Sequence, residues 1–165
     1  MSRTKKPPVA ADEWQEAVNL TEIEKAYIAG FFDGEGTIGI AAVTRRPNGI
    51  TKNGYRLYIV IGQVDGDFLH WLKAKYKGYL LLRPRRENHQ PIWQWRLENR
   101  LARIFLTDIQ PYLRLKAQQC ALGLAFQQTK GLRKNRGVTG FTPEEWAFEE
   151  EVYTKMRELN HKGAA

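Results

Sequence analysis

Two pairs of strand-like segments, each preceded by a helical segment, constrain the fold of this chain most strongly. Residues 37–46 and 55–64 are rich in β-forming residues and are joined by PNGITKNG, whose Asn-Gly pairs are turn signals. A second pair, 79–85 and 92–98, is separated by the polar stretch ENHQP. With a helix before each pair and more helices after them, this order predicts one antiparallel sheet with helices on one face, an α+β fold.

The helical segments are predicted from capping signals and from apolar residues at helical spacing. Thr21 and Glu24 have the spacing of a capping box, and Ile23, Tyr27 and Phe31 follow at intervals of four, so a helix is expected over 22–34. Thr142-Pro143-Glu144-Glu145 opens the last helix, which is expected to run to about Leu159, because proline suits a first helical position. The other expected helices cover 65–76, 99–108 and 115–129.

The length and composition are those of one globular domain. Of 165 residues, 42% are hydrophobic, yet no apolar run approaches the roughly 20 residues that a membrane span needs. We expect a flexible arm over 1–19 and a single domain over 20–165. The basic start has no apolar segment of a secretory signal behind it, so we expect an intracellular protein without a membrane partner or a small-molecule substrate.

Positive charge is concentrated in the middle of the chain. Residues 37–136 hold 19 Lys/Arg against five Asp/Glu, and such a field attracts polyanions, most commonly nucleic acid. Strand alternation places basic and hydrogen-bonding side chains on one face of the sheet, which is either an ordinary solvent face or a surface that reads base edges. The DNA-binding candidates on the strands and at the hairpin tip are Thr37, Arg45, Arg46, Lys52, Arg56, Tyr58, Arg83, Arg85, Gln94 and Arg96. A second basic loop offers Lys130, Arg133, Lys134 and Arg136 for phosphates.

The first helix has two features that packing within the chain explains poorly. Ala26, Gly30 and Gly34 recur every four residues, which strips one face of side chains and allows a close approach of another helix. Asp33 and Glu35 stand at the C-terminal end, where the helix dipole disfavours anions. Two interpretations remain open at this point: a glycine cap with two solvated acids, or a site for a hard divalent cation.

Three segments in order along the chain carry a family resemblance. The stretch 27–38, YIAGFFDGEGTI, resembles the signature of the LAGLIDADG homing endonucleases. IGQVDGDFLHWL (61–72) and IQPYLRLKAQQ (109–119) are similar to two further segments of that family. The resemblance therefore extends over about 20–129.

The resemblance implies an αββαββα core with a saddle-shaped antiparallel sheet over DNA, followed here by extra C-terminal helices. A chain with one signature resembles the single-motif members, which act as homodimers. The implied dimer interface consists of Ala26, Gly30, Asp33 and Gly34. A two-fold dimer implies a long, roughly palindromic target in double-stranded DNA.

The resemblance also implies the chemistry of the site. Glu35 would bind Mg²⁺, or another divalent cation such as Mn²⁺, with help from the Gly34 carbonyl. Gln63 would order the catalytic water, and Lys116 would lie near the scissile phosphate. The expected activity is that of an intron-encoded, site-specific double-strand DNA endonuclease. The alternatives are a cleavage-inactive DNA-binding protein or RNA-splicing maturase on the same fold, and a basic ribosome- or RNA-associated structural protein.

Overall fold

The order of elements follows the expected one. The computed structural model describes residues 19–45, 52–84, 89–131 and 142–162, so the expected arm lies outside these ranges except for Asn19. The elements are α1 (Glu22–Glu35), β1 (Gly36–Arg45), β2 (Lys52–Gln63), α2 (Asp67–Tyr76), β3 (Tyr79–Arg83), β4 (Ile92–Glu98), α3 (Asn99–Ile109), the 3-10 helix η3 (Gln110–Tyr112), α4 (Ala117–Gly131) and α5 (Pro143–Lys162). Their bounds differ from the expected ones by three residues or fewer, and the α+β architecture is confirmed.

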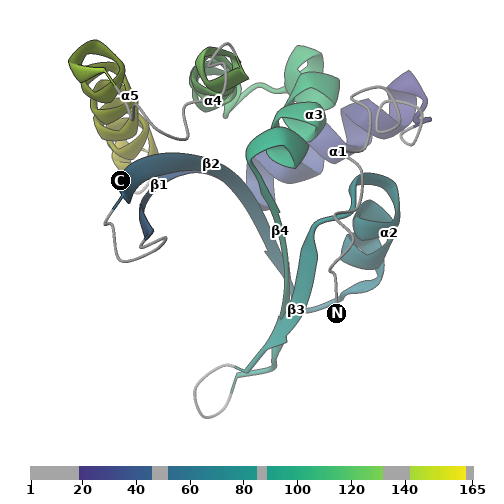
Figure 1. Ribbon diagram of the computed structural model, residues 1–165. Coiled ribbons are helices and arrows are strands. Elements are labelled where there is room, and N and C mark those ends of the chain that lie inside the picture. Colours follow the sequence, from purple (N-terminus) through teal and green to yellow (C-terminus); the bar gives the residue numbers. More distant parts are fainter. Residues whose placement is uncertain (1–18, 46–51, 85–88, 132–141, 163–165) are drawn as a thin grey trace, which may run out of the picture.

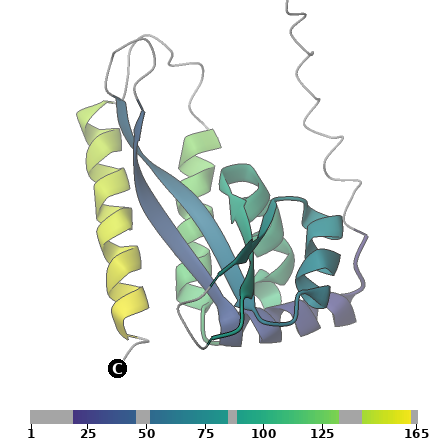
Figure 2. The same ribbon diagram turned by 90° about the horizontal axis from the view of Figure 1, so that it is seen from below.

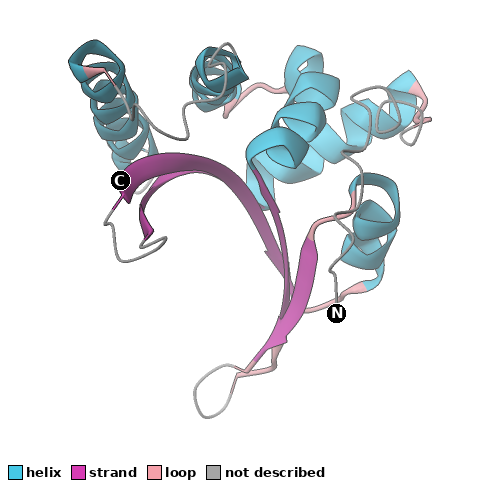
Figure 3. Cartoon of the chain, viewed as in Figure 1, coloured by secondary structure: helices cyan, strands magenta, loops and turns pink. Residues whose placement is uncertain are grey.

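The four strands form one curved antiparallel sheet in the order β1-β2-β4-β3. The helices lie on the convex side of this sheet, and none of those in the described ranges covers its concave side (Figures 1 and 3). Figure 2 shows α5 running alongside the β1–β2 hairpin. No described helix is both long and apolar enough to cross a membrane.

Strand alternation explains which face of the sheet is buried. Leu57, Ile59 and Ile61 on β2 are fully buried under the helices, whereas Arg56 and Tyr58 point to the concave side and are half-buried. The buried apolar side chains form one cluster that runs from Leu20 to Met156. Fully burying one such side chain stabilises a fold by roughly 1.5–3 kcal/mol, so this layer fixes the position of the helices on the sheet.

Local signals fix both ends of α1. The capping box is present: the Thr21 hydroxyl accepts from the Glu24 amide at 3.2 Å, and the Glu24 carboxylate accepts from the Thr21 amide at 2.7 Å. At the other end Gly36 passes directly into β1 against the buried Phe32 ring, since a Cβ on Gly36 would lie 2.2 Å from Phe32 Cδ2. The tight junction leaves Glu35 at the point where helix and sheet meet.

The C-terminal helices extend the convex layer. The Tyr55 ring on β2 packs against Tyr153 of α5 at 4.9 Å and against Trp146 at 5.6 Å between ring centroids. Near its other end, α5 is tied to β1 by the Asn160 amide, which donates to the Ile38 carbonyl at 2.9 Å. These contacts support the long β1–β2 hairpin on the helix-covered side of the sheet.

Candidate functional site

The C-terminal end of α1 presents a carboxylate and backbone carbonyls to the surface. Glu35 and Gly34 are both exposed. The last carbonyls of a helix have no amide partner within it. Here the Phe32 carbonyl accepts from the amide of the cap residue Gly36, and the Asp33 carbonyl accepts from the Lys116 ammonium. Gly34 belongs to the same turn, so its carbonyl and the Glu35 carboxylate are oxygen donors of the kind that a hard cation prefers.

Asp33 differs from its expected place in a dimer interface. Its side chain is only 8% exposed and accepts three backbone amides of the turn before α4: Arg114 N at 2.7 Å, Leu115 N at 3.1 Å and Lys116 N at 2.9 Å. A carboxylate needs such donors when it loses water, and the turn supplies them. Asp33 therefore joins α1 to α4 inside one chain.

Lys116 is brought to the end of α1 by the same turn. Its ammonium donates to the Asp33 carbonyl, at the negative end of the α1 dipole. Partial burial lowers the pKa of Lys116, and the negative charges of Asp33 and Glu35 oppose that shift. The Lys116 ammonium thus lies at the carbonyl of Asp33, which is two residues before Glu35 in the chain.

Gln63 lies next to the same helix end. It is the last residue of β2, pairs with Trp93 and is half-buried. Because Gly36, the first residue of β1, pairs with Ile61, the strand continues from Ile61 to Gln63 alongside the last turn of α1. The structure places Gly34 and Glu35 in the last turn of α1, Lys116 against the Asp33 carbonyl and Gln63 at the adjoining end of β2. Their roles stay predictions.

One face of α1 is bare. Ala26, Gly30 and Gly34 are exposed, and a Cβ built on either glycine would meet no atom of the described residues within 4 Å. Large apolar side chains flank this face: Ile23 is 83% exposed, and Tyr27 is 62% exposed. Leu115, in the turn next to Asp33, is 76% exposed. Exposed apolar side chains beside a bare helix face are typical of a protein interface.

The concave face of the sheet is less basic than alternation alone suggests. Arg56 and Arg96 both form ion pairs with Glu98, at 2.9 and 2.7 Å. Arg96 also lies over the Tyr58 ring, with its guanidinium carbon 4.4 Å from the ring centroid. Thr37, Arg83 and Gln94 occupy the same face as expected, and Thr37 and Arg83 are exposed. Exposed Tyr79 and Leu81 on β3 give this face an apolar end.

Several predicted DNA-binding residues cannot be placed. Arg45 and Lys52 pair with each other at the end of the β1–β2 hairpin, but their side chains fall outside the described part of the chain. The same holds for the whole of five further candidates, Arg46, Arg85, Arg133, Lys134 and Arg136.

Lys130 differs from its expected role in phosphate binding. Its ammonium donates to the Tyr55 carbonyl and lies 4.7 Å from the centroid of the Phe126 ring. Both partners belong to the helix-covered side of the sheet, where Phe126 is fully buried. The ammonium is thus satisfied within the chain by a carbonyl and an aromatic face, away from the concave surface.

The donor set fits a divalent cation only in part within one chain. No group of three or more His, Cys, Asp or Glu side chains comes together among the described residues. One carboxylate and one carbonyl suit Mg²⁺, which keeps several waters and shares phosphate oxygens with its substrate. The residues at the end of α1 therefore fit a cation whose remaining ligands come from water or from outside this chain.

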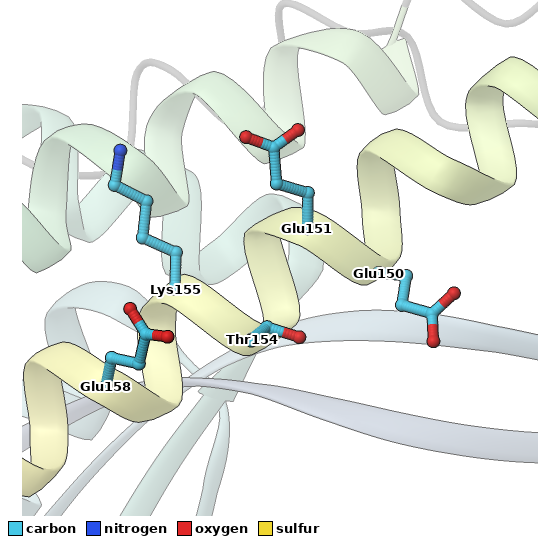
Figure 4. Close-up of a pocket in the computed structure, with 5 residues that line it drawn as sticks. All are labelled: Glu150, Glu151, Thr154, Lys155 and Glu158. Carbon is cyan, nitrogen blue, oxygen red and sulfur yellow. The ribbon is translucent and has the colours of Figure 1, made fainter.

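A hollow along α5 does not resemble a site for DNA. Figure 4 shows five polar residues of α5 along it, three of them acidic: Glu150, Glu151, Thr154, Lys155 and Glu158. Negative charge there repels a polyanion.

Sequence reasoning missed Glu98, Gly39 and Leu115. Glu98 follows the alternation of β4 and could have been assigned to the concave face beside Arg96. Gly39 pairs with Tyr58, whose ring fills the space that a Cβ would need, at 2.3 Å from Tyr58 Cζ. No local signal identifies Leu115, because its exposure depends on the packing of a turn.

Solved structures with a similar fold are homing endonucleases. I-CvuI in complex with its target, with calcium present, is 20% identical with a TM-score of 0.65, over 84% of this chain and 82% of that chain. A second I-CvuI complex contains magnesium and DNA that is not cleaved. The archaeal intron-encoded I-Vdi141I, complexed with DNA, is 14% identical with a TM-score of 0.53, over 84% of this chain and 98% of that chain.

A longer neighbour matches over less than half of its length. I-GzeII, a LAGLIDADG homing endonuclease in complex with a DNA target, is 15% identical with a TM-score of 0.58, over 81% of this chain and 43% of that chain. A scan against protein-family models and a search of curated proteins gave no match. The arrangement of helices and sheet shows that this chain has the fold of the LAGLIDADG homing endonucleases.

Proposed function

We propose that this protein is a metal-dependent, site-specific DNA endonuclease that acts as a homodimer and cuts both strands of its target. The observation that carries the proposal is the end of α1, where Gly34 and Glu35 are exposed, the Lys116 ammonium donates to the Asp33 carbonyl, and one helix face is uncovered. The DNA complexes of the neighbours support the substrate class.

The bare face of α1 supports the homodimer. Glycine within a helix costs roughly 0.5–1 kcal/mol relative to alanine, and no described residue of the same chain uses the space at Gly30 or Gly34. A second copy of α1 would occupy that space, and Ile23 and Tyr27 would be buried at its edges. Two α1 helices in contact bring two Glu35 side chains together, one for each strand of a duplex.

The reaction is phosphodiester hydrolysis, in which a water oxygen adds to phosphorus and one phosphorus–oxygen bond of the backbone breaks. A divalent cation such as Mg²⁺ or Mn²⁺, held by Glu35 and the Gly34 carbonyl, would supply positive charge to the attacking and leaving oxygens. Lys116 adds a second positive charge for the phosphate oxygens. The Gln63 amide can donate and accept at once, which suits it to orient the water.

The direct test is cleavage of a plasmid that carries a candidate target. If the gene lies within an intron, the joined flanking sequences are that candidate. We expect a double-strand break that requires Mg²⁺ and disappears with EDTA. Sequence-specific binding without any break would favour the alternative of a cleavage-inactive DNA-binding protein or splicing maturase on this fold.

Glu35→Gln separates catalysis from binding. It keeps the size of the side chain but removes its charge, so we expect the cleavage rate to fall by at least about 100-fold while DNA binding persists. Glu151→Gln, the same change at an exposed position of α5, is the matched control and should cut normally. Normal cleavage by Glu35→Gln would show that the metal assignment is wrong.

A further inference from the structure

We propose that Glu98 is a positioning residue for base recognition, which holds Arg96 on the concave face so that its guanidinium reads a guanine in each half of the target. The inference rests on the proposed binding of specific DNA, but not on cleavage. It assigns a role to an acid that charge alone would exclude from a DNA-binding surface.

The first observation is the division of the Glu98 carboxylate between two arginines. One oxygen accepts from Arg96 Nε at 2.7 Å, and the other forms an ion pair with Arg56 Nη1 at 2.9 Å. The three side chains are between 22% and 31% exposed, so water only partly screens these pairs. Arg56 comes from β2 and Arg96 from β4, so the carboxylate joins the two central strands.

The second observation is which nitrogen of Arg96 is used. Because Glu98 binds Nε, the two terminal nitrogens stay available, and they have no hydrogen-bond partner among the described residues. A pair of terminal N–H donors matches guanine O6 and N7 in the major groove, the commonest specific contact between arginine and a base. Arg56 differs, since its Nε is buried without a partner and Nη1 is engaged. We therefore assign base reading to Arg96 and bracing of Glu98 to Arg56.

The third observation is an aromatic support for Arg96. The Tyr58 ring lies 4.4 Å from the Arg96 guanidinium carbon. That ring can lie flat on the sheet because its neighbour on β1 is Gly39, where a Cβ would come within 2.3 Å of it. Strand register places Tyr58 opposite Glu98, so ring and carboxylate restrain Arg96 from two sides. Restraint before binding reduces the side-chain entropy that is lost on the DNA.

The competing explanation is that Glu98 only neutralises two surface arginines. An acid in that role would weaken binding to every sequence equally, since phosphate contacts carry no base information. A positioning acid makes a different prediction: its loss would weaken discrimination between bases while general affinity for DNA stays or rises. Discrimination is therefore the quantity to measure.

The experiment is selection of binding sites from a library of duplexes with a randomised centre, in EDTA so that no cleavage occurs. The proteins compared are the wild type, Glu98→Gln and Arg96→Lys. Glutamine keeps the shape of Glu98 but offers one guanidinium a donor in place of an acceptor. Lysine keeps the charge of Arg96 but lacks the paired donors. Glu151→Gln, which removes one negative charge from α5, is the control for net charge.

We expect the wild type and Glu151→Gln to select the same guanine in both half-sites. Glu98→Gln and Arg96→Lys should each lose at least about fivefold in preference at that base pair, the lower end for a bidentate contact. Their affinity for unselected duplex should not fall. If both variants retain the wild-type preference at every position, Glu98 and Arg96 do not read the target and the inference is overturned. If the wild type selects no sequence at all, specific DNA binding fails together with the inference.

Discussion

Asp33 connects the C-terminal end of α1 to the turn that carries Lys116. The residues that it joins are more than 80 positions apart, and three amides converge on its two carboxylate oxygens. The Lys116 ammonium returns to the Asp33 carbonyl, so the side chain and the backbone of one residue position Lys116 from two directions. The geometry of the proposed site therefore depends on a residue that does not belong to it.

Asp33→Asn tests this connection. The amide group turns an acceptor into a donor facing backbone N–H groups, so we expect a loss of about 1–3 kcal/mol in the free energy of unfolding. Urea denaturation at one fixed protein concentration measures it, because the stability of a dimer depends on concentration. Glu150→Gln on the exposed side of α5 is the control and should change stability by less than about 0.5 kcal/mol. An unchanged Asp33→Asn variant would contradict the role of this carboxylate.

Cys120 is an ordinary core residue, and the reactivity of its thiol should report unfolding of the chain. It is fully buried on α4, and burial raises the pKa of its thiol from 9.0 to about 12. We expect no alkylation by iodoacetamide at pH 8 until the chain unfolds. Gln118→Cys places a thiol at an exposed position of the same helix and should react at once. Equal rates for the two thiols in the native protein would contradict the buried position.

The same shift gives a pH dependence of stability. The folded-state pKa of Cys120 lies above the unfolded value, so the unfolded chain loses this proton first as the pH rises. The contribution of Cys120 is thus fully present below pH 9 and is lost as the pH rises from 9 towards 12. Cys120→Ala should flatten this part of the stability profile, measured by urea denaturation. An identical profile for the wild type and Cys120→Ala would show that the thiol ionises equally in both states.

At the scale of elements, α1 and its C-cap use glycine for different purposes. Gly30 faces open space, so Gly30→Leu should fold and should even gain helix propensity, but the added side chain should block the approach of a second α1. Sedimentation should show a monomer that no longer cuts DNA. Ala121→Leu, on an exposed position of α4, adds similar bulk and should remain a dimer. A dimeric Gly30→Leu would place the interface elsewhere.

Gly36, the C-cap of α1, should respond to substitution in the opposite way, through the stability of the fold. A Cβ on Gly36 would lie 2.2 Å from the buried Phe32 ring. Gly36→Ala should therefore disturb the junction of α1 and β1 and lower the stability of the monomer itself. Thermal unfolding followed by circular dichroism should show a lower midpoint for Gly36→Ala than for Gly30→Ala. The reverse order would mean that the glycine face, and not the junction, supports the fold.

The elements were predictable because their signals are local. The capping box at Thr21, the proline at the start of α5 and the alternation along β2 each occupy a few consecutive residues. The connections between elements were not predictable in this way. Glu98 with Arg56, Asp33 with the turn before α4, and Lys130 with Tyr55 all depend on strand register or helix packing. The resemblance to a family predicts Glu35, Gln63 and Lys116 as site residues, but it gives no indication that Arg96 is held by Glu98 and Tyr58.

At the scale of the whole molecule, charge and shape favour one direction of approach for DNA. The concave side of the sheet has no described helix over it and carries arginines from both central strands, whereas α5 on the convex side exposes Glu150, Glu151 and Glu158 (Figures 1 and 4). Opposite charges on opposite sides steer a polyanion before contact is made. The long axis of the sheet then determines how much of the duplex one subunit can cover.

The symmetry of the target is the remaining consequence of a dimer formed through α1. Two subunits related by a two-fold axis present the same concave surface to the two strands in opposite directions, so their half-sites must form an inverted repeat. Three duplexes of equal length test this: the selected half-site as an inverted repeat, as a direct repeat, and as a single copy in neutral sequence. We expect a double-strand break only in the inverted repeat, and binding to it that is at least about tenfold tighter than to the others, because two linked contacts act together. If the direct repeat is cut equally well, the subunits are not arranged as the exposed face of α1 requires, whatever the identity of the catalytic residues.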